Sequence, residues 1–190
     1  QVLQDLQQAW RRTFPGWVAG GDCSWASNLM CDAQGMVTRI NLYNALLTGS
    51  IAGSISALDR LTYLDLSHNR LIGSIPSIIG MSRLNFLYLD KNAISGSIPS
   101  SISNVSNLIV LNLSSNNLTG SIPSTIGNMI SLTYLSLSTN AISGSIPSSI
   151  SNLSKLTLLL LDSNILTGSI PSILDNISSL HYLSVSRQVN

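Results

Sequence analysis

Apolar and polar residues alternate over short stretches that return at regular intervals along most of the chain. Five stretches have the pattern Leu-x-x-Leu-x-Leu-x-x-Asn. A period of two is typical of a short β-strand with one face buried in a core. The leucines that we expect to point inward are Leu64 and Leu66, Leu87 and Leu89, Leu111 and Leu113, Leu135 and Leu137, and Leu159 and Leu161.

These strands belong to a longer unit that repeats without interruption. Four units of equal length cover 84–107, 108–131, 132–155 and 156–179, and the unit before them, 61–83, is one residue shorter. A looser unit begins at residue 37, and an incomplete one begins at residue 180. One unit cannot bury its own leucine and isoleucine side chains, so the units must stack and share a core. The strands would then form a parallel sheet, with about 4.7 to 4.9 Å between neighbours.

Two further features recur in each unit. An asparagine follows each strand, and its amide can bond backbone groups that would otherwise be buried without partners. A Gly-Ser-Ile-Pro segment starts four positions after that asparagine. There Gly permits an unusual backbone turn and Pro restricts φ. Ala45 and Gln188 replace the asparagine in the first and last units, so polar groups should be less well satisfied at both ends. The predicted asparagine ladder consists of Asn69, Asn92, Asn116, Asn140 and Asn164.

The combined pattern, LxxLxLxxNxLxGxIPxxI, resembles the plant-type leucine-rich repeat of receptor-kinase ectodomains and polygalacturonase-inhibiting proteins. The resemblance covers about 37–190. It implies an α/β solenoid: a right-handed superhelix with a concave parallel sheet, an extra short strand at each Gly-Ser-Ile-Pro segment and 3-10 or irregular convex structure. We expect an N-terminal cap over 1–36 and about six full repeats plus a partial seventh over 37–190. The residue missing between Pro76 and Leu84 should perturb the convex side.

The N-terminal segment differs in composition from the repeats. Its apolar residues recur at spacings close to one helical face, which predicts an amphipathic helix. Such a helix would cover the edge that the first repeat otherwise exposes. The residues on the predicted apolar face are Val2, Leu3, Leu6, Ala9 and Trp10.

The two cysteines lie in a segment that resembles the N-terminal cap of extracellular plant-type repeats, in which a Cys-x-Trp pair precedes a second Cys. Here the two are Cys23 and Cys31. Two cysteines cannot supply a four-ligand zinc site, and His68 and His181 lie in distant repeats. We therefore predict a disulfide and an oxidising, extracellular compartment. Two buried free thiols are the alternative.

Five Asn-x-Ser/Thr sequons agree with a secreted or extracellular location. Asparagine and serine together fill more than a quarter of the chain, so several sequons would arise by chance. Asn112 lies within a predicted strand, where a glycan would obstruct the concave face, and we expect it to be unmodified. The candidate glycosylation sites are Asn104, Asn117, Asn152 and Asn176.

Charge and motifs exclude several classes of function. The chain has nine Lys and Arg, eight Asp and no Glu, and only Arg11 and Arg12 are adjacent, which argues against a nucleic-acid binder. No apolar run approaches the roughly 18 residues of a membrane span. No phosphate-loop, dinucleotide, metal or paired-glutamate motif occurs, so we expect no cofactor and no enzymatic activity. Asp65, Ser67 and His68 come nearest to a catalytic set, but nothing supplies an oriented base and an oxyanion hole.

The outward strand positions carry the strongest functional signal. Four of the five Tyr and one of the two Phe fall at the third or fifth position of a unit, which should face outward on the concave sheet. Exposed aromatic residues mark interaction surfaces, although they also support cross-strand neighbours. We predict a non-enzymatic binding module that recognises a protein or peptide. The predicted contact residues are Arg39, Tyr63, Asp65, Phe86, Tyr88, Val110, Tyr134, Leu158, Leu160 and Tyr182.

A second function stays open. The string AISGSIPSSISN occurs at both 93–104 and 141–152, and this repetition creates ranks of hydroxyls away from the concave side. Regular hydroxyl arrays suit ice-binding solenoids, and some plant-type leucine-rich repeats resemble antifreeze proteins. The residues for this alternative are Ser95, Thr119, Ser143 and Thr167.

The chain stops inside a repeat, without the paired cysteines or polar unit expected of a C-terminal cap. Capping repeats usually keep solenoids soluble. We therefore expect either a longer protein, continuing into a membrane anchor or a kinase, or a partner that covers this edge.

Overall fold

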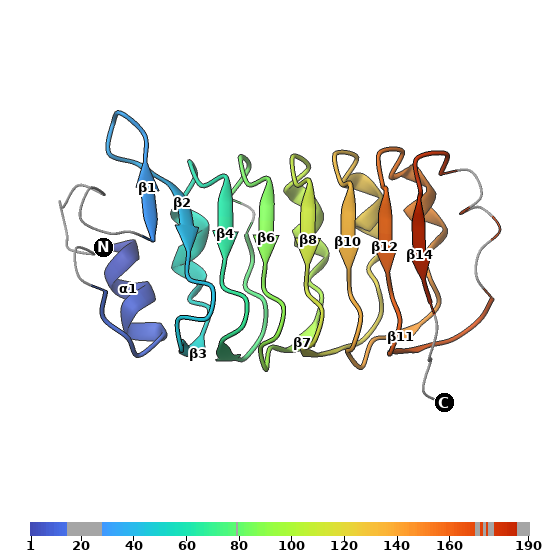
Figure 1. Cartoon of the computed structure of the whole chain (residues 1–190), viewed down its shortest axis with the longest axis horizontal. Helices are drawn as coiled ribbons and strands as arrows, with labels where there is room; N and C mark the ends of the chain where they lie inside the picture. The colour runs from blue at the N-terminus through green and yellow to red at the C-terminus, as the bar shows by residue number, and fades with distance from the viewer. Residues whose placement is uncertain (15–27, 79, 170–171, 173, 175–176, 186–190) are drawn as a thin grey trace.

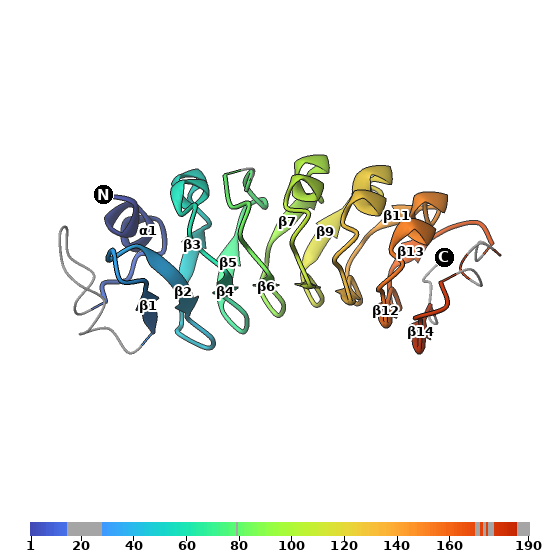
Figure 2. The same cartoon turned by 90° about the horizontal axis from the view of Figure 1, so that it is seen from above.

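The computed structural model of the chain describes residues 1–14, 28–78, 80–169, 172, 174 and 177–185. The repeats stack side by side in chain order into an elongated solenoid (Figure 1). Viewed from above, the long sheet follows the inner side of a shallow arc and the helical turns follow its outer side (Figure 2). The predicted solenoid with a concave sheet is therefore confirmed.

One eight-stranded sheet runs the length of the molecule. Its first pair is antiparallel and all the other pairs are parallel. Each parallel pair aligns equal positions of successive repeats, so that Tyr63 lies opposite Phe86 and Phe86 lies opposite Val110. The strands, in spatial order, are β1 (Leu29–Cys31), β2 (Val37–Asn41), β4 (Tyr63–Asp65), β6 (Phe86–Tyr88), β8 (Val110–Asn112), β10 (Tyr134–Ser136), β12 (Leu158–Leu160) and β14 (Tyr182–Ser184).

A second, short strand forms at or just before each Gly-Ser-Ile-Pro segment, as the resemblance implies. These strands pair in parallel as β3–β5, β7–β9 and β11–β13. The glycine of the segment has a positive φ, for example 79° at Gly96. A side chain at such a glycine would strain the backbone. The strands are β3 (Thr48–Ser50), β5 (Arg70–Ile72), β7 (Ser95–Ser97), β9 (Asn117–Thr119), β11 (Ser143–Gly144) and β13 (Ile165–Leu166).

The convex side consists of short 3-10 helices. They are η2 (Gly53–Ala57), η3 (Ser100–Asn104), η4 (Ser124–Asn128) and η5 (Ser148–Asn152). In the shorter unit, 61–83, the described residues between Pro76 and Leu84 contain no 3-10 helix. The missing residue therefore changes the convex side at the position where we expected a perturbation.

The core is a continuous column of aliphatic side chains between the sheet and the 3-10 helices. The ten leucines predicted to point inward are all at most 2% exposed. Isoleucines of the Gly-Ser-Ile-Pro segments, such as Ile98 and Ile122, close the column from the other side and are 4% exposed. Burial shared between neighbouring repeats is the main stabilising term of such a stack.

The five asparagines form a ladder that joins neighbouring repeats. In Asn116, Oδ1 accepts a hydrogen bond from the backbone N–H of Ile94 (3.0 Å) in the preceding repeat. Its Nδ2 donates to the carbonyl oxygens of Leu89 (2.9 Å) and Leu113 (3.2 Å). Asn69, Asn92, Asn140 and Asn164 make the same set of bonds.

The turn of the first repeat differs where alanine replaces the ladder asparagine. In each repeat one residue before the ladder position has a positive φ, for example 56° at His68. In the first repeat Asn44 takes that role, and Leu46, directly after Ala45, adopts a second positive φ of 56°. Left-handed backbone at such a residue costs about 1 to 2 kcal/mol. The loss of the amide is therefore accompanied by a strained turn.

Helix α1 (Val2–Ala9) lies against one end of the stack, as predicted. The side chains of Leu6 and Trp10 are fully buried there. The backbone N–H of Thr48 in β3 donates to the carbonyl oxygen of Trp10 (3.4 Å). A Cβ at Gly49 would collide with the carbonyl of Ala9, so glycine is needed where the helix meets β3. The division at residue 36 stays a prediction.

Cys31 ends β1, next to the first strand of the repeats. It is not a free thiol in the described part of the structure. Its predicted partner, Cys23, lies outside the described residues, as do Gln188 and the sequon at Asn176. The disulfide pairing therefore stays a prediction. Across the described residues, none of the helices has the length and apolar character needed to cross a bilayer.

Candidate binding surface on the concave sheet

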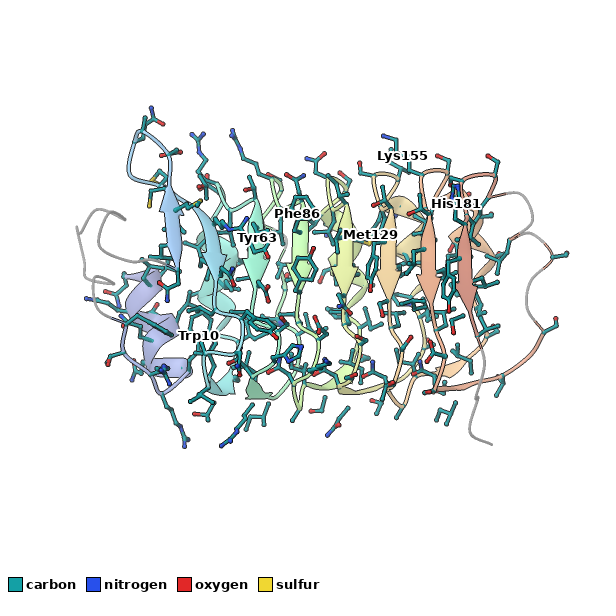
Figure 3. All side chains as sticks on the ribbon, viewed as in Figure 1. Trp10, Tyr63, Phe86, Met129, Lys155 and His181 are labelled. Carbon is teal, nitrogen blue, oxygen red and sulfur yellow. The ribbon has the colours of Figure 1, made fainter. Side chains whose placement is uncertain are left out.

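The third and fifth residues of the repeats line the concave face of the sheet. Figure 3 shows Tyr63 and Phe86 on the face turned away from the helical turns. Tyr63, Phe86, Tyr88 and Tyr134 are half-buried and lie outside the core, and Tyr182 is 57% exposed. The aromatic columns predicted from the sequence are therefore present on an accessible face.

Several of these side chains contact one another across neighbouring strands. The ring centroid of Tyr63 lies 5.9 Å from that of Phe86 and 5.7 Å from that of Tyr88. The Cζ of Arg39 lies 3.5 Å from the centroid of the Tyr63 ring, in a cation–π arrangement. Such aromatic pairs contribute about 0.5 to 1.5 kcal/mol beyond area burial. The rings are thus held in place before any partner arrives.

Two carboxylates lie beside these rings. Asp65 is 8% exposed and Asp90 is 9% exposed. Asp65 Oδ1 accepts hydrogen bonds from the backbone N–H (2.9 Å) and the hydroxyl (2.6 Å) of Ser67, and Oδ2 accepts one from Tyr63 (3.3 Å). We call Tyr63, Asp65, Tyr88 and Asp90 the acidic-aromatic patch. The sequence predicted that Asp65 would project from the sheet. It does point to the concave side, but it is buried there and bonded to the hydroxyl of Tyr63.

Asp90 is less well compensated than Asp65. Its ion-pair contact is with His68, whose Nε2 lies 4.0 Å from Asp90 Oδ2. Burial raises the pKa of Asp90, and a backbone hydrogen bond and His68 only partly oppose this effect. Burial, together with the negative charge of Asp65, also raises the pKa of Tyr63 and of Tyr88. Burial and the charge of Asp65 therefore disfavour further negative charge in the patch, and the guanidinium of Arg39 opposes this effect at both tyrosines.

The charge of Asp162 is better compensated than that of Asp90. It occupies the same repeat position as Asp90, and Ser138 donates a hydrogen bond to its Oδ1 (2.7 Å). Burial acts to raise the pKa of Asp162, but hydrogen bonds from Ser138 and Ser184 outweigh burial and the pKa is lowered. Its negative charge is already satisfied within the protein.

The other half of the concave face carries aliphatic and aromatic side chains beside the uncharged polar residues Asn112 and Ser136. Val110, Tyr134 and Leu158 lie side by side in β8, β10 and β12, and Leu160 takes the fifth position in β12. All four side chains are half-buried. We call these four residues the apolar strip. The concave face therefore changes from aromatic and acidic to aliphatic along the solenoid.

The Asp65, Ser67 and His68 set does not assemble into a catalytic relay. The hydroxyl of Ser67 donates to Asp65, as described above. The ring centroid of His68 instead lies 4.7 Å from that of Tyr43, and its Nε2 faces Asp90. Within the described part of the chain, no group of three His, Cys, Asp or Glu side chains could hold a metal ion.

The structure adds residues that the sequence analysis missed. Asp90 and His68 follow their strands at the seventh and eighth positions, outside the two columns that we considered. The alternation by two continues through the seventh position, so Asp90 faces the same side as Tyr88. That continued alternation was a signal in the sequence that pointed to Asp90.

The hydroxyls proposed for ice binding lie on the side of the solenoid that carries the short strands. Ser95, Thr119 and Thr167 are exposed, and Ser143 is half-buried. Ser95 and Ser143 donate their hydroxyls to carbonyls of Gly73 (3.4 Å) and Gly120 (3.2 Å). Ile72, which is 55% exposed, takes the equivalent position in the unit 61–83 and interrupts the rank.

The described sequons lie on different faces. Asn104 and Asn152 are exposed at the ends of η3 and η5 on the convex side. Asn117 is exposed in β9. Asn112 lies in β8 on the concave face, where its Oδ1 accepts hydrogen bonds from the backbone and hydroxyl of Ser114 (3.2 and 2.8 Å). A glycan at Asn112 would therefore compete with this local bonding.

Comparison with known proteins agrees with the repeat pattern. Sequence models described as leucine rich repeat match residues 60–81, 82–142 and 106–166. The chain belongs to the leucine-rich repeat family. The receptor-like kinase TMK2 of Arabidopsis thaliana is 33% identical over 70 residues, which are 37% of this chain and 8% of TMK2. The chain thus spans only a small part of this relative.

Solved structures of plant receptor ectodomains share the fold. The ectodomain of GASSHO1/SCHENGEN3 from Arabidopsis thaliana, in complex with CASPARIAN STRIP INTEGRITY FACTOR 2, matches with a TM-score of 0.90 and 32% identity, over 98% of this chain and 24% of that chain. The Arabidopsis receptor kinase HAESA, in complex with the peptide hormone IDA and the co-receptor SERK1, matches with a TM-score of 0.87 and 31% identity, over 97% and 32%. The SOBIR1 ectodomain from Arabidopsis thaliana matches with a TM-score of 0.77 and 32% identity, over 88% of this chain and 93% of that chain. The leucine-rich repeats are therefore of the plant receptor-ectodomain type.

Proposed function

We propose that this chain is an extracellular binding module whose concave sheet recognises a peptide or protein partner. The observation that carries the proposal is the row of outward aromatic and aliphatic side chains on the concave face, which the core does not use. Preformed surfaces of this kind lose little conformational entropy on binding. The structural neighbour HAESA is in complex with a peptide hormone, and the GASSHO1 ectodomain is also in complex with a partner, which supports the same role here.

The test is a selection of peptides on the immobilised protein from a phage-displayed library of random dodecapeptides. Selected peptides are then synthesised and their affinity is measured by calorimetry. We expect the variant Tyr63→Ala/Tyr88→Ala/Tyr134→Ala to bind them at least tenfold more weakly, because large buried aromatic anchors dominate binding energy.

Stability is controlled in two ways. The rings of Tyr63 and Tyr88 contact each other, so the single variant Tyr134→Ala, outside that contact, is measured as well. The matched control replaces three serines on the side of the short strands, Ser97, Ser121 and Ser145, by Ala. The proposal is wrong if no peptide is selected, or if the serine variant weakens binding as much as the tyrosine variant does.

Ice binding is a second candidate function. The observation that favours it is the exposed hydroxyl pattern Ser/Thr-Gly-Ser, which pairs Ser97 with Thr119 across β7 and β9. An ice-recrystallisation assay tests it, with Thr119→Lys as the variant that should abolish the effect. Ice binding is wrong as a function if the wild-type protein at high concentration does not inhibit ice recrystallisation.

A further inference from the structure

We propose that the acidic-aromatic patch binds a cationic side chain, Arg or Lys, of an extended peptide, and that the apolar strip binds an aliphatic side chain about four residues away in the same peptide. This inference rests on the proposed function and deepens it, because it states the chemistry and the spacing of the partner. Four observations carry it: the position of Tyr88, the state of the two carboxylates, the composition of the strip and the repeat spacing.

Tyr88 lies between the two carboxylates. Asp65 is its direct partner on the neighbouring strand, and Asp90 follows two residues later on the same side of the chain. Tyr63 lies in the same strand as Asp65, diagonally opposite Tyr88, with 5.7 Å between the two ring centroids. A cation over the Tyr88 ring would meet a π-face and two carboxylates together, which is the environment that guanidinium and ammonium groups prefer.

In the part of the chain that the structure describes, no Lys or Arg forms an ion pair with Asp65 or Asp90. Among the described residues, the only ion-pair contact of either carboxylate is the one between His68 and Asp90 at 4.0 Å. The guanidinium of Arg39 stacks on Tyr63. Lys91 follows Asp90 in the turn, but its side chain is exposed. Buried carboxylates without a cation are unfavourable. A ligand cation would reduce this cost at Asp90, the less compensated of the two carboxylates, where burial raises the pKa.

The apolar strip favours the opposite chemistry. In β8, β10 and β12, the residues at the third and fifth positions of the repeat are uncharged. In β12 both of these residues are leucines. Asp162, two residues after Leu160, already accepts hydrogen bonds from serines. An aliphatic side chain of the peptide can bury apolar surface there without leaving a charge unpaired.

The repeat geometry sets the spacing. Tyr88 lies in β6 and Leu160 lies in β12, three strands further along the sheet. Strands are about 4.8 Å apart, so Leu160, which forms the aliphatic subsite at the far end of the apolar strip, is about 14 Å from Tyr88. An extended peptide that crosses the strands advances about 3.3 Å per residue, so about four residues separate the two side chains.

The test uses synthetic peptide libraries in which one Arg and one Leu are fixed, two to seven residues apart, and all other positions are random mixtures of uncharged residues. Binding to the immobilised protein is measured by surface plasmon resonance. We expect the strongest binding at separations of three to five residues, in one of the two orders of Arg and Leu. Replacement of Arg by norleucine should weaken binding at least tenfold.

Protein variants identify the two subsites. Asp65→Asn and Asp90→Asn should each weaken the Arg peptide at least fivefold and leave the norleucine peptide unchanged. Leu160→Ser should weaken both peptides. Asp162→Asn is the matched control, because it removes the same charge outside the acidic-aromatic patch, and it should change the binding of neither peptide. Because burial raises the pKa of Asp90, neutralising it should not destabilise the protein, and urea denaturation of this variant should exclude unfolding as the cause of lost binding.

The outcomes separate this inference from the proposed function. If peptides bind and the triple tyrosine variant loses them, but neither Arg nor spacing matters, the inference is wrong and the proposed function stands. If binding is insensitive to all concave variants, the proposed function is wrong and this inference with it. If Asp162→Asn weakens binding as strongly as Asp90→Asn, general charge attraction explains the result and the cation subsite is wrong.

Discussion

The ladder asparagines should be the polar residues on which the stack depends most, and Asn116→Ala tests this in the middle of the solenoid. The side chain is 8% exposed. Its removal leaves the backbone N–H of Ile94 without an acceptor, because this N–H donates to Asn116 Oδ1 and to no other atom of the described residues. The carbonyl oxygens of Leu89 and Leu113 each keep one asparagine donor, from Asn92 and Asn140.

The magnitude follows from these contacts. An orphaned buried donor costs about 1 to 3 kcal/mol, and each of the two lost bonds to a carbonyl that keeps a partner costs about 0.5 to 1.5 kcal/mol. We therefore expect the free energy of unfolding to fall by about 2 to 6 kcal/mol. Asn117→Ala is the matched control, since this neighbouring side chain is exposed. That variant should change stability by less than about 0.5 kcal/mol.

The assay is urea denaturation followed by circular dichroism, on protein without glycans. A change in the midpoint at constant slope measures stability, whereas a changed slope reveals that part of the solenoid unfolds separately. Asn116→Asp separates the two kinds of bond, because a carboxylate keeps the acceptor for Ile94 but loses both donors. Destabilisation by Asn116→Ala of less than about 1 kcal/mol would refute the orphaned-donor argument.

Single contacts underlie three further predictions. Gly49→Ala should lower Tm more than Gly35→Ala does. Both glycines have a positive φ, but of the two only Gly49 faces a backbone carbonyl, that of Ala9. Thermal melts of the two variants measure which Tm is lower. Asp90 has a raised pKa in the folded protein, so its contribution to stability falls as pH rises through the range between the ordinary value of 3.8 and the folded value. Asp90→Asn should therefore be more stable than the parent at neutral pH and equal to it below that range, as urea denaturation at a series of pH values will measure. Thiol titration of the native protein should find neither Cys23 nor Cys31 reactive, and two free thiols would contradict the predicted disulfide.

The acidic-aromatic patch and the apolar strip can lie on one sheet because the outward positions are free to vary between repeats. The inward positions of the repeats are nearly invariant because each must fill the same space between neighbouring coils. The outward positions have no such requirement, so Asp65 and Tyr88 can occupy a position that is Asn112, Ser136 or Leu160 in other repeats. The scaffold is therefore free to carry different chemistry on different repeats.

The amino-acid pattern alone was enough to predict the stack of repeats, the inward leucines, the asparagine ladder and the columns that face outward. These features follow from the alternation within each strand and from the regular return of the whole unit. Because every repeat has the same pattern of inward residues, neighbouring strands can fill the core in only one register. Which outward side chains meet became visible only in the folded stack. The stacking of Arg39 on Tyr63, the contact between the rings of Tyr63 and Tyr88 and the approach of His68 to Asp90 join residues of different repeats. Each depends on rotamers and on neighbours that do not repeat, which no periodicity encodes.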